Sequence, residues 1–114
     1  MAAIPPTSGQ SFLVVRSVVQ DAAMRPRFDH WYGTDHAPKA GTMLGANRAW
    51  RFWSLSDESV HYAVYEFASE AKLRAAMASS AVPALMAEYD ATWPAGVSRT
   101  RELIVEASLP RWPA

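Results

Sequence analysis

The chain has 114 residues, of which 50% are hydrophobic and 19% charged, and this composition is typical of one ordered domain. Its 11 basic residues balance 11 acidic ones, so the chain lacks the positive charge that nucleic-acid binding requires, and its apolar runs are shorter than the roughly 20 residues that span a bilayer. The absence of cysteine excludes disulfides, thiolate nucleophiles and cysteine metal sites, which fits a cytoplasmic protein.

Residues 1–10 are predicted to form a flexible arm, and the first regular element follows directly. Residues 12–19 (FLVVRSVV) are rich in β-branched side chains, which indicates a strand. Apart from Arg16 and Ser17, both alternating faces of this strand are apolar. A sheet covered on one side only would alternate more cleanly, so we expect this strand to be buried on both faces.

Residues 26–36 are predicted to form a helix. Phe28, Tyr32 and His36 recur every four residues and therefore share one stripe of it. Proline disfavours helical geometry at the residue before it, so Pro38 predicts that the helix ends or kinks near His36. A short loop or turn is expected over residues 41–45.

The second half of the chain has the pattern of a hairpin, a helical region and a final strand. The hairpin strands are predicted at 47–55 and 60–68, joined by a polar turn. Helical spacing of apolar residues extends from Ser69, a plausible N-cap, to Trp93. A last strand over 97–107 precedes a Pro-rich tail at 108–114.

The order β-α-β-β-α-β predicts an α+β fold of the ferredoxin-like type, with a four-stranded antiparallel sheet and helices on one face. We expect one domain over residues 1–114. The apolar first strand and the aromatic second strand indicate that the bare face of the sheet is also covered. The simplest cover is a second copy of the same sheet, related by a two-fold axis.

Residues 28–38 (FDHWYGTDHAP) resemble the signature of the EthD-like branch of the dimeric α/β-barrel proteins, a W-Y-x-x-x-H-x-P pattern at the end of the first helix. The matching residues are Trp31, Tyr32, Asp35, His36 and Pro38. The resemblance implies a ferredoxin-like protomer, a homodimer whose two sheets form a barrel, and a pocket between helices and sheet. That superfamily includes cofactor-free quinol monooxygenases, polyketide cyclases, lactone isomerases and haem-degrading enzymes, so the fold does not select a reaction.

His36 and Tyr32 are the candidate catalytic residues. Imidazole titrates near neutral pH, so His36 is suited to general acid–base chemistry, and the alternative is a structural histidine that caps the helix. Tyr32 lies one turn earlier, where its hydroxyl would hold a substrate oxygen or orient the imidazole; the alternative is a core tyrosine. His30 is out of phase with this stripe and is expected to face solvent, and His61 is assigned no role.

Arg51 interrupts an aromatic strand and needs a partner, either a substrate carboxylate or enolate, or Glu66 or Glu102 in the sheet. Tyr89 and Trp93 end the last helical segment, with the spacing either of a pocket wall or of plain core. The complete set of predicted substrate-binding residues is Trp31, Phe28, Asp35, Arg51, Tyr89 and Trp93.

The favoured function is a small enzyme that uses a histidine acid/base on a cyclic or aromatic substrate, polyketide-like, quinol or lactone, by cyclisation, isomerisation or cofactor-free oxygenation. The alternative is a non-catalytic protein of the same fold that binds a small apolar or aromatic ligand or has an accessory role. The three histidines lack zinc-site spacing, so no metal is predicted. No cofactor is expected, although haem and flavin stay open.

Overall fold

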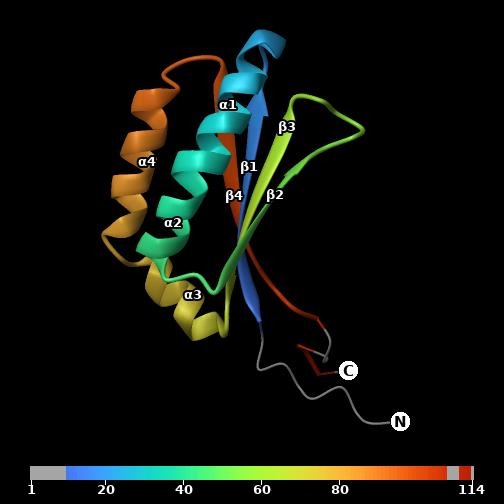
Figure 1. Cartoon of the computed structure of the whole chain (residues 1–114). Coiled ribbons are helices and arrows are strands. Elements are labelled where there is room, and N and C mark those ends of the chain that lie inside the picture. The colour runs from blue at the N-terminus through green and yellow to red at the C-terminus, as the bar shows by residue number, and fades with distance from the viewer. Residues whose placement is uncertain (1–9, 108–110, 114) are drawn as a thin grey trace.

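The computed structural model describes residues 10–107 and 111–113, so most of the predicted arm and part of the predicted tail lie outside the described residues. The elements run along the chain as shown in Figure 1. They are β1 (Ser11–Val19), the 3₁₀-helix η1 (Ala22–Met24), α1 (Arg25–Trp31), the π-helix η2 (Tyr32–His36), α2 (Ala37–Leu44), β2 (Arg48–Trp53), β3 (Val60–Phe67), α3 (Glu70–Met77), α4 (Ala81–Thr92) and β4 (Val97–Val105).

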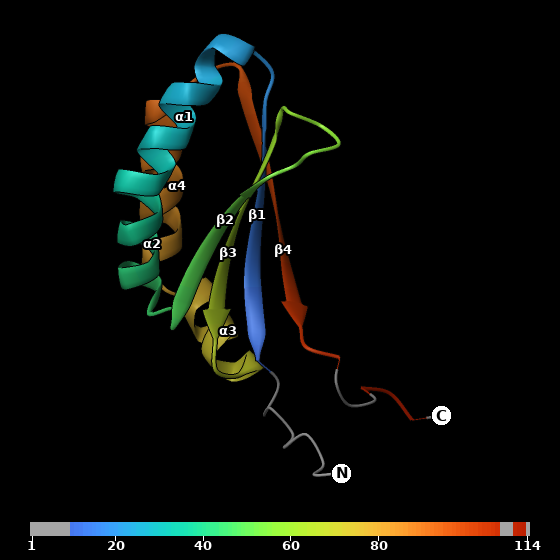
Figure 2. The same ribbon diagram turned by 45° about the vertical axis from the view of Figure 1, so that its right-hand side comes forward.

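The four strands form one antiparallel sheet in the order β2-β3-β1-β4. Both crossover connections carry helices, and all the helices lie on the same face of the sheet (Figures 1 and 2). This arrangement is the predicted ferredoxin-like α+β fold, which is confirmed. The strands at both hairpin positions and at the end of the chain are each one to three residues shorter than expected.

The first helical region is longer than predicted. The expected end near His36 and the expected loop over 41–45 are wrong, because helical structure continues to Leu44 and ends at Gly45, whose φ of 72° is left-handed. Pro38 is accommodated because the turn before it is π-helical: the Ala37 N–H donates to the carbonyl of Tyr32, five residues back. Pro38 therefore lies in the first turn of α2, where a missing N–H is tolerated.

The core lies between the helices and one face of the sheet. On β1 the helix-facing side chains are Leu13, Val15, Ser17 and Val19, and the register places Tyr65 of β3 beside Leu13. The opposite face is only partly covered, as Phe52 is 52% exposed. Among the described residues, no helix is both long and apolar enough to cross a membrane.

Candidate active site

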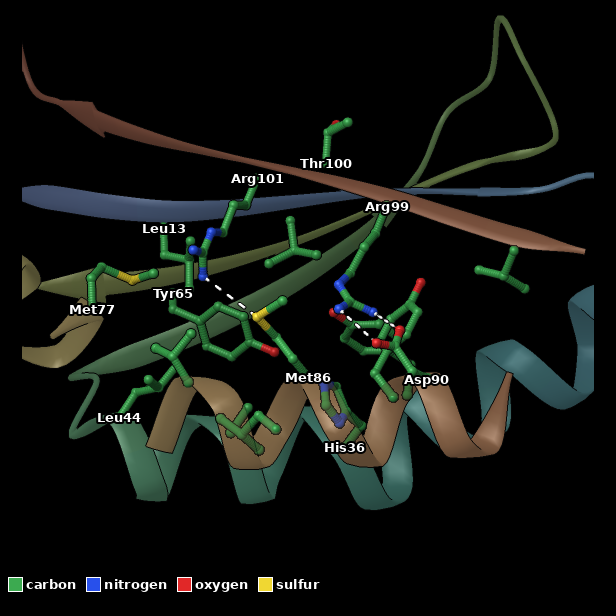
Figure 3. A pocket seen from close by; sticks show the side chains of 17 residues that line it. Leu13, His36, Leu44, Tyr65, Met77, Met86, Asp90, Arg99, Thr100 and Arg101 are labelled. Carbon is green, nitrogen blue, oxygen red and sulfur yellow. Dashed lines mark hydrogen bonds and ion pairs between the residues drawn. The ribbon is translucent and has the colours of Figure 1, made fainter. Parts of the chain in front are cut away.

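A cavity of about 430 Å³ lies between the helices and the β1–β4 half of the sheet (Figure 3). Its walls come from η2, α2, α4 and the strands β1, β3 and β4, and most of its lining is apolar. Polar groups enter it from both the helix side and the sheet side. Those polar or charged residues are Tyr32, His36, Tyr65, Tyr89, Asp90, Arg99, Thr100 and Arg101.

The π-helical turn explains how Tyr32 and His36 both reach this cavity. A stripe of residues four apart drifts by roughly 40° per step in a regular α-helix, so Phe28 and Leu44 would lie on nearly opposite sides. The wider π-turn cancels part of this drift, and Phe28, Tyr32, His36 and Leu44 are all buried. The predicted stripe of Phe28, Tyr32 and His36 is thereby confirmed and extended along α2. Single π-turns inside helices are frequent at functional sites.

His36 is held on three sides and is 5% exposed. The indole of Trp31 stacks on the imidazole, with ring centroids 4.5 Å apart and planes 18° apart. The rings of Tyr32 and Tyr89 meet it edge-on. Its Nδ1 lies 3.6 Å from Oε1 of Glu88 on α4, which is longer than a hydrogen bond but close enough for charge to act. Because a carboxylate only accepts, this contact favours the tautomer with the proton on Nδ1 and leaves Nε2 as the base.

Opposing effects act on the titration of His36. Burial lowers the pKa of His36 below its ordinary value, while the carboxylate of Glu88 raises it. Glu88 is in turn held by Lys39, whose Nζ lies 2.7 Å from Oε2, and this hydrogen bond lowers the pKa of Glu88. His36 is therefore neutral near pH 7 and able to accept a proton. Nothing in the sequence singled out Glu88, which reads as an ordinary charged residue of a surface helix.

Three tyrosines line the cavity, and they differ in how their hydroxyls are engaged. The Tyr89 hydroxyl lies 2.7 Å from the Ser17 hydroxyl, so it has a partner. Neither the Tyr32 nor the Tyr65 hydroxyl has a hydrogen-bond partner within the described part of the chain. Tyr65 was not among the predicted site residues. Tyr65 lies two residues after Ala63 in β3, and residues two apart in a strand share a face. This spacing would have placed Tyr65 on the helix-facing side.

The sheet side of the cavity carries two arginines that the sequence analysis did not single out. Arg99 forms an ion pair with Asp90 of α4, and its guanidinium lies 4.4 Å from the centroid of the Tyr89 ring. Arg101 contacts the sulfur of Met86, as Figure 3 shows. Their spacing of two residues in a strand is the signal that puts both on one face.

Phe28, Trp31, Trp93 and Asp35 do not line this cavity. Phe28 is fully buried behind Tyr32, with ring centroids 5.3 Å apart, and Trp31 and Trp93 pack against Phe28. Trp31 thus contacts His36 and supports it from behind. Asp35 is exposed, and so is His30, as predicted for that histidine.

Arg51 also lies outside the cavity lining, at the β2 edge of the core. The expected partners Glu66 and Glu102 are wrong: its Nη1 lies 3.0 Å from Oδ1 of Asp29 and 3.2 Å from Nε2 of His61. The same Asp29 oxygen accepts a hydrogen bond of 2.7 Å from the Trp53 indole. The partner changed because Arg51 faces the helices, whereas Glu66 lies on the other face, where it pairs with Arg48.

Within residues 10–107 and 111–113, no group of three or more histidine, aspartate or glutamate side chains gathers closely enough to hold a metal ion.

Comparison with solved structures places the fold. A variant of SnoaB, a cofactor-independent oxygenase from Streptomyces nogalater, superposes with a TM-score of 0.63 at 14% identity, over 90% of this chain and 98% of that one. An ethyl tert-butyl ether d (ethd) family protein from Bacillus halodurans superposes with a TM-score of 0.57 at 12% identity, over 80% and 96% of the two chains. The chain has the fold of an EthD family protein.

A third similar structure is a putative antibiotic biosynthesis monooxygenase from Caulobacter crescentus, with a TM-score of 0.56 at 18% identity over 85% of this chain and 90% of that one. No protein-family profile matches the sequence, and no curated protein matches it. The likeness to the EthD-like fold that Trp31, Tyr32 and His36 suggested is therefore borne out at the level of structure. Identities this low establish the fold and leave the reaction to the residues of the cavity.

Proposed function

We propose that the chain is a small enzyme that uses His36 as a general acid/base on a cyclic or aromatic carbonyl compound bound in the cavity. The observation that carries the proposal is the placement of His36: a buried, neutral imidazole at the cavity wall, with the carboxylate of Glu88 3.6 Å from Nδ1. A base oriented by a third group is the usual arrangement of general-base sites. Glu88 acts here as a positioning residue.

The cavity supports a substrate of moderate size. Its volume of about 430 Å³ falls within the roughly 300–1,000 Å³ typical of small-molecule sites. Residues such as Leu13, Val15 and Leu85 give the lining a large apolar part, and tyrosines, His36 and charged residues contribute the polar groups. Such a lining suits a flat polyketide-like, quinol or lactone ring with one or two oxygen substituents.

The reaction begins with removal of a proton from the carbon beside a carbonyl or from a phenolic hydroxyl. Nε2 of His36 accepts this proton, and the electron pair ends on the carbonyl oxygen or stays on the phenolic oxygen, which Tyr32 holds. The resulting enolate closes a ring, returns the proton at another carbon, or reacts with molecular oxygen. Cyclisation, isomerisation and cofactor-free oxygenation thus share one first step, and no bound cofactor is proposed for it. The structural likeness to a cofactor-independent oxygenase supports the third outcome.

The proposal includes a homodimer formed through the uncovered face of the sheet. Apolar and aromatic side chains gather there: Phe12 and Trp50 lie with ring centroids 6.5 Å apart, and Phe52 and Ile104 are 52% and 42% exposed. Contiguous exposed apolar surface of this kind marks an interaction site, and a second copy presents the same surface in return. Light scattering in solution tests this point, and a monomer contradicts it.

The test of the function compares the wild type with His36→Ala on a panel of quinols, polyketide-like aromatics and lactones. Product formation and oxygen consumption are recorded in parallel. A positioned general base typically supplies about 10²–10⁴-fold, so His36→Ala should lose about that much activity while its melting temperature shows an intact fold. A loss below tenfold excludes His36 as the base. Ligand binding without turnover by the wild type favours the alternative, a non-catalytic binding or accessory protein.

A further inference from the structure

Two hydroxyls in the cavity have no assigned partner, and they come from opposite walls. Tyr32 enters from the π-turn η2 and Tyr65 from β3, and their side chains are 0% and 2% exposed. Figure 3 shows Tyr65 reaching from the sheet toward the helices that carry His36. Neither oxygen has a hydrogen-bond partner among residues 10–107 and 111–113.

A buried hydroxyl without a partner is costly, at about 1–3 kcal/mol each. Native structures seldom retain two such groups side by side without a use for them. The contrast with Tyr89 in the same cavity is direct, because its hydroxyl lies 2.7 Å from the hydroxyl of Ser17. Among the described residues, the hydroxyls of Tyr32 and Tyr65 lie near each other, without the geometry of a hydrogen bond. Both can therefore turn toward a ligand oxygen.

The two hydroxyls are close enough to interact: Tyr65 raises the pKa of Tyr32, and Tyr32 lowers the pKa of Tyr65. Burial raises the pKa of Tyr32 well above its ordinary value, and burial raises the pKa of Tyr65 to about 12. Both groups therefore keep their protons at neutral pH and are donors. Two donors of this kind in an apolar site are suited to an oxygen that carries negative charge.

We propose that Tyr32 and Tyr65 together form an oxyanion hole that holds the enolate or phenolate oxygen of the substrate. This inference deepens the proposed function and rests on it. The substrate class is accordingly an enolisable ketone or a phenol, with its oxygen between the two tyrosines and its acidic hydrogen toward His36. In the step itself the substrate C–H or O–H bond breaks, the proton passes to Nε2 of His36, and the electron pair ends on the oxygen held by both tyrosines.

Arg99 and Arg101 are the competing anion sites in the cavity. Arg101 is an exposed residue whose guanidinium contacts the sulfur of Met86. Arg99 is more deeply engaged. Its guanidinium is already paired with the carboxylate of Asp90 and lies over the ring of Tyr89. An anion would have to displace Asp90 to use it fully. The two phenols need no such rearrangement, which is why we assign the oxyanion to them.

The experiment uses nitrophenols of graded acidity as probes, because their absorbance reports whether the bound form is phenol or phenolate. The wild type should bind the phenolate in preference to the phenol. Tyr32→Phe and Tyr65→Phe should each weaken phenolate binding by about 10- to 100-fold, as expected for a hydrogen bond to a charged group. Both variants should melt at or above the wild-type temperature, since each removes an unpaired buried hydroxyl.

The matched control is Tyr62→Phe, which makes the same change on the opposite face of β3 and should leave phenolate affinity unchanged. His36→Ala distinguishes the role of His36 as the base from the oxyanion hole of the two tyrosines. Lost turnover with retained phenolate binding supports both roles. Retained turnover overturns the role of His36 and leaves the oxyanion hole standing. Equal binding of phenol and phenolate overturns the oxyanion hole. So does phenolate binding that survives both Tyr→Phe changes and is lost in Arg99→Met or Arg101→Met.

Discussion

His36 and His61 are two buried histidines in one small core, and their neighbours are opposite in charge. Nδ1 of His36 faces a carboxylate, that of Glu88, whereas Nε2 of His61 lies 3.2 Å from a guanidinium nitrogen of Arg51. Because Arg51 can only donate, Nε2 of His61 must accept, and its proton sits on Nδ1. Nε2 of His36 is thus the nitrogen available to a ligand, whereas Nε2 of His61 already accepts from Arg51.

The difference shows that burial alone does not suit a histidine to acid–base chemistry near neutral pH. Burial lowers the pKa of both side chains, and the cation of Arg51 adds to this effect at His61, where the pKa falls to about 4. At His36 the neighbouring carboxylate of Glu88 raises the pKa and so opposes the effect of burial. A base that works near neutral pH needs this compensation together with access to a ligand, and within the described structure His61 does not line the cavity that His36 lines.

The largest expected effect concerns His61 and acid. The folded chain holds this histidine neutral down to about pH 4, while the unfolded chain protonates it near pH 6.5, so protons favour unfolding between these values. We expect the free energy of unfolding to fall by up to about 3 kcal/mol across this window. Urea unfolding at a series of pH values measures the slope.

In His61→Gln the slope between pH 6.5 and pH 5 should be markedly smaller, and in His36→Gln it should shrink less. The window stops at pH 5 because Asp29 and Glu88, whose pKa values are lowered, contribute with the same sign at lower pH. An unchanged slope in His61→Gln would show that this histidine is already protonated in the folded chain.

The next effect concerns the carboxylate that distinguishes His36. Glu88→Gln should lower kcat by about tenfold, because it removes the negative charge that stabilises the His36 imidazolium when the base takes up a proton. Since Glu88 raises the pKa of His36, its loss lowers that pKa, and the acid limb of kcat/KM should move to lower pH. Lys39→Met should move the limb to higher pH, because Lys39 lowers the pKa of His36 and occupies Glu88. Shifts in the same direction for both variants would refute this account.

The smallest effect tests how tightly the His61 region is packed. A methyl group added at Gly33 would lie 2.7 Å from Nη2 of Arg51, so Gly33→Ala must displace the side chain that pairs with Asp29. In an Arg51→Met background the methyl group has room, and alanine gains about 1 kcal/mol of helix propensity over glycine. A double-mutant cycle by urea unfolding should give a coupling of about 1 kcal/mol.

Gly41→Ala is the matched control for that cycle, since nothing lies within 4 Å of the added methyl group. It should have the same effect in both backgrounds. If Gly33→Ala also has the same effect in both backgrounds, the coupling energy is zero. Arg51 would then move aside without weakening its pairing with Asp29.

Much of the fold follows from local patterns. The strand β1 is readable from its run of β-branched residues, and the hairpin β2–β3 from its two strand patterns around a polar turn. The N-cap at Ser69, whose hydroxyl accepts from the Lys72 N–H, is likewise a local signal. The four-residue spacing identified the stripe of Phe28, Tyr32 and His36, of which Tyr32 and His36 line the cavity and Phe28 lies in the core behind them. The helix end predicted from Pro38 was wrong, because the effect of proline on the preceding backbone is local. A π-turn accommodates Pro38 without ending the helix.

By itself the sequence determined the order of the elements, the helices on one side of the sheet and the stripe that bears His36, because each depends on neighbours a few residues apart. Only the tertiary structure decided that Glu88 lies beside His36, that Asp29 pairs with Arg51, and that Tyr32 lies near Tyr65. These pairs are separated by 22 to 52 positions along the chain. Their contact depends on strand order and on the rotation of helices over the sheet, which no local pattern encodes.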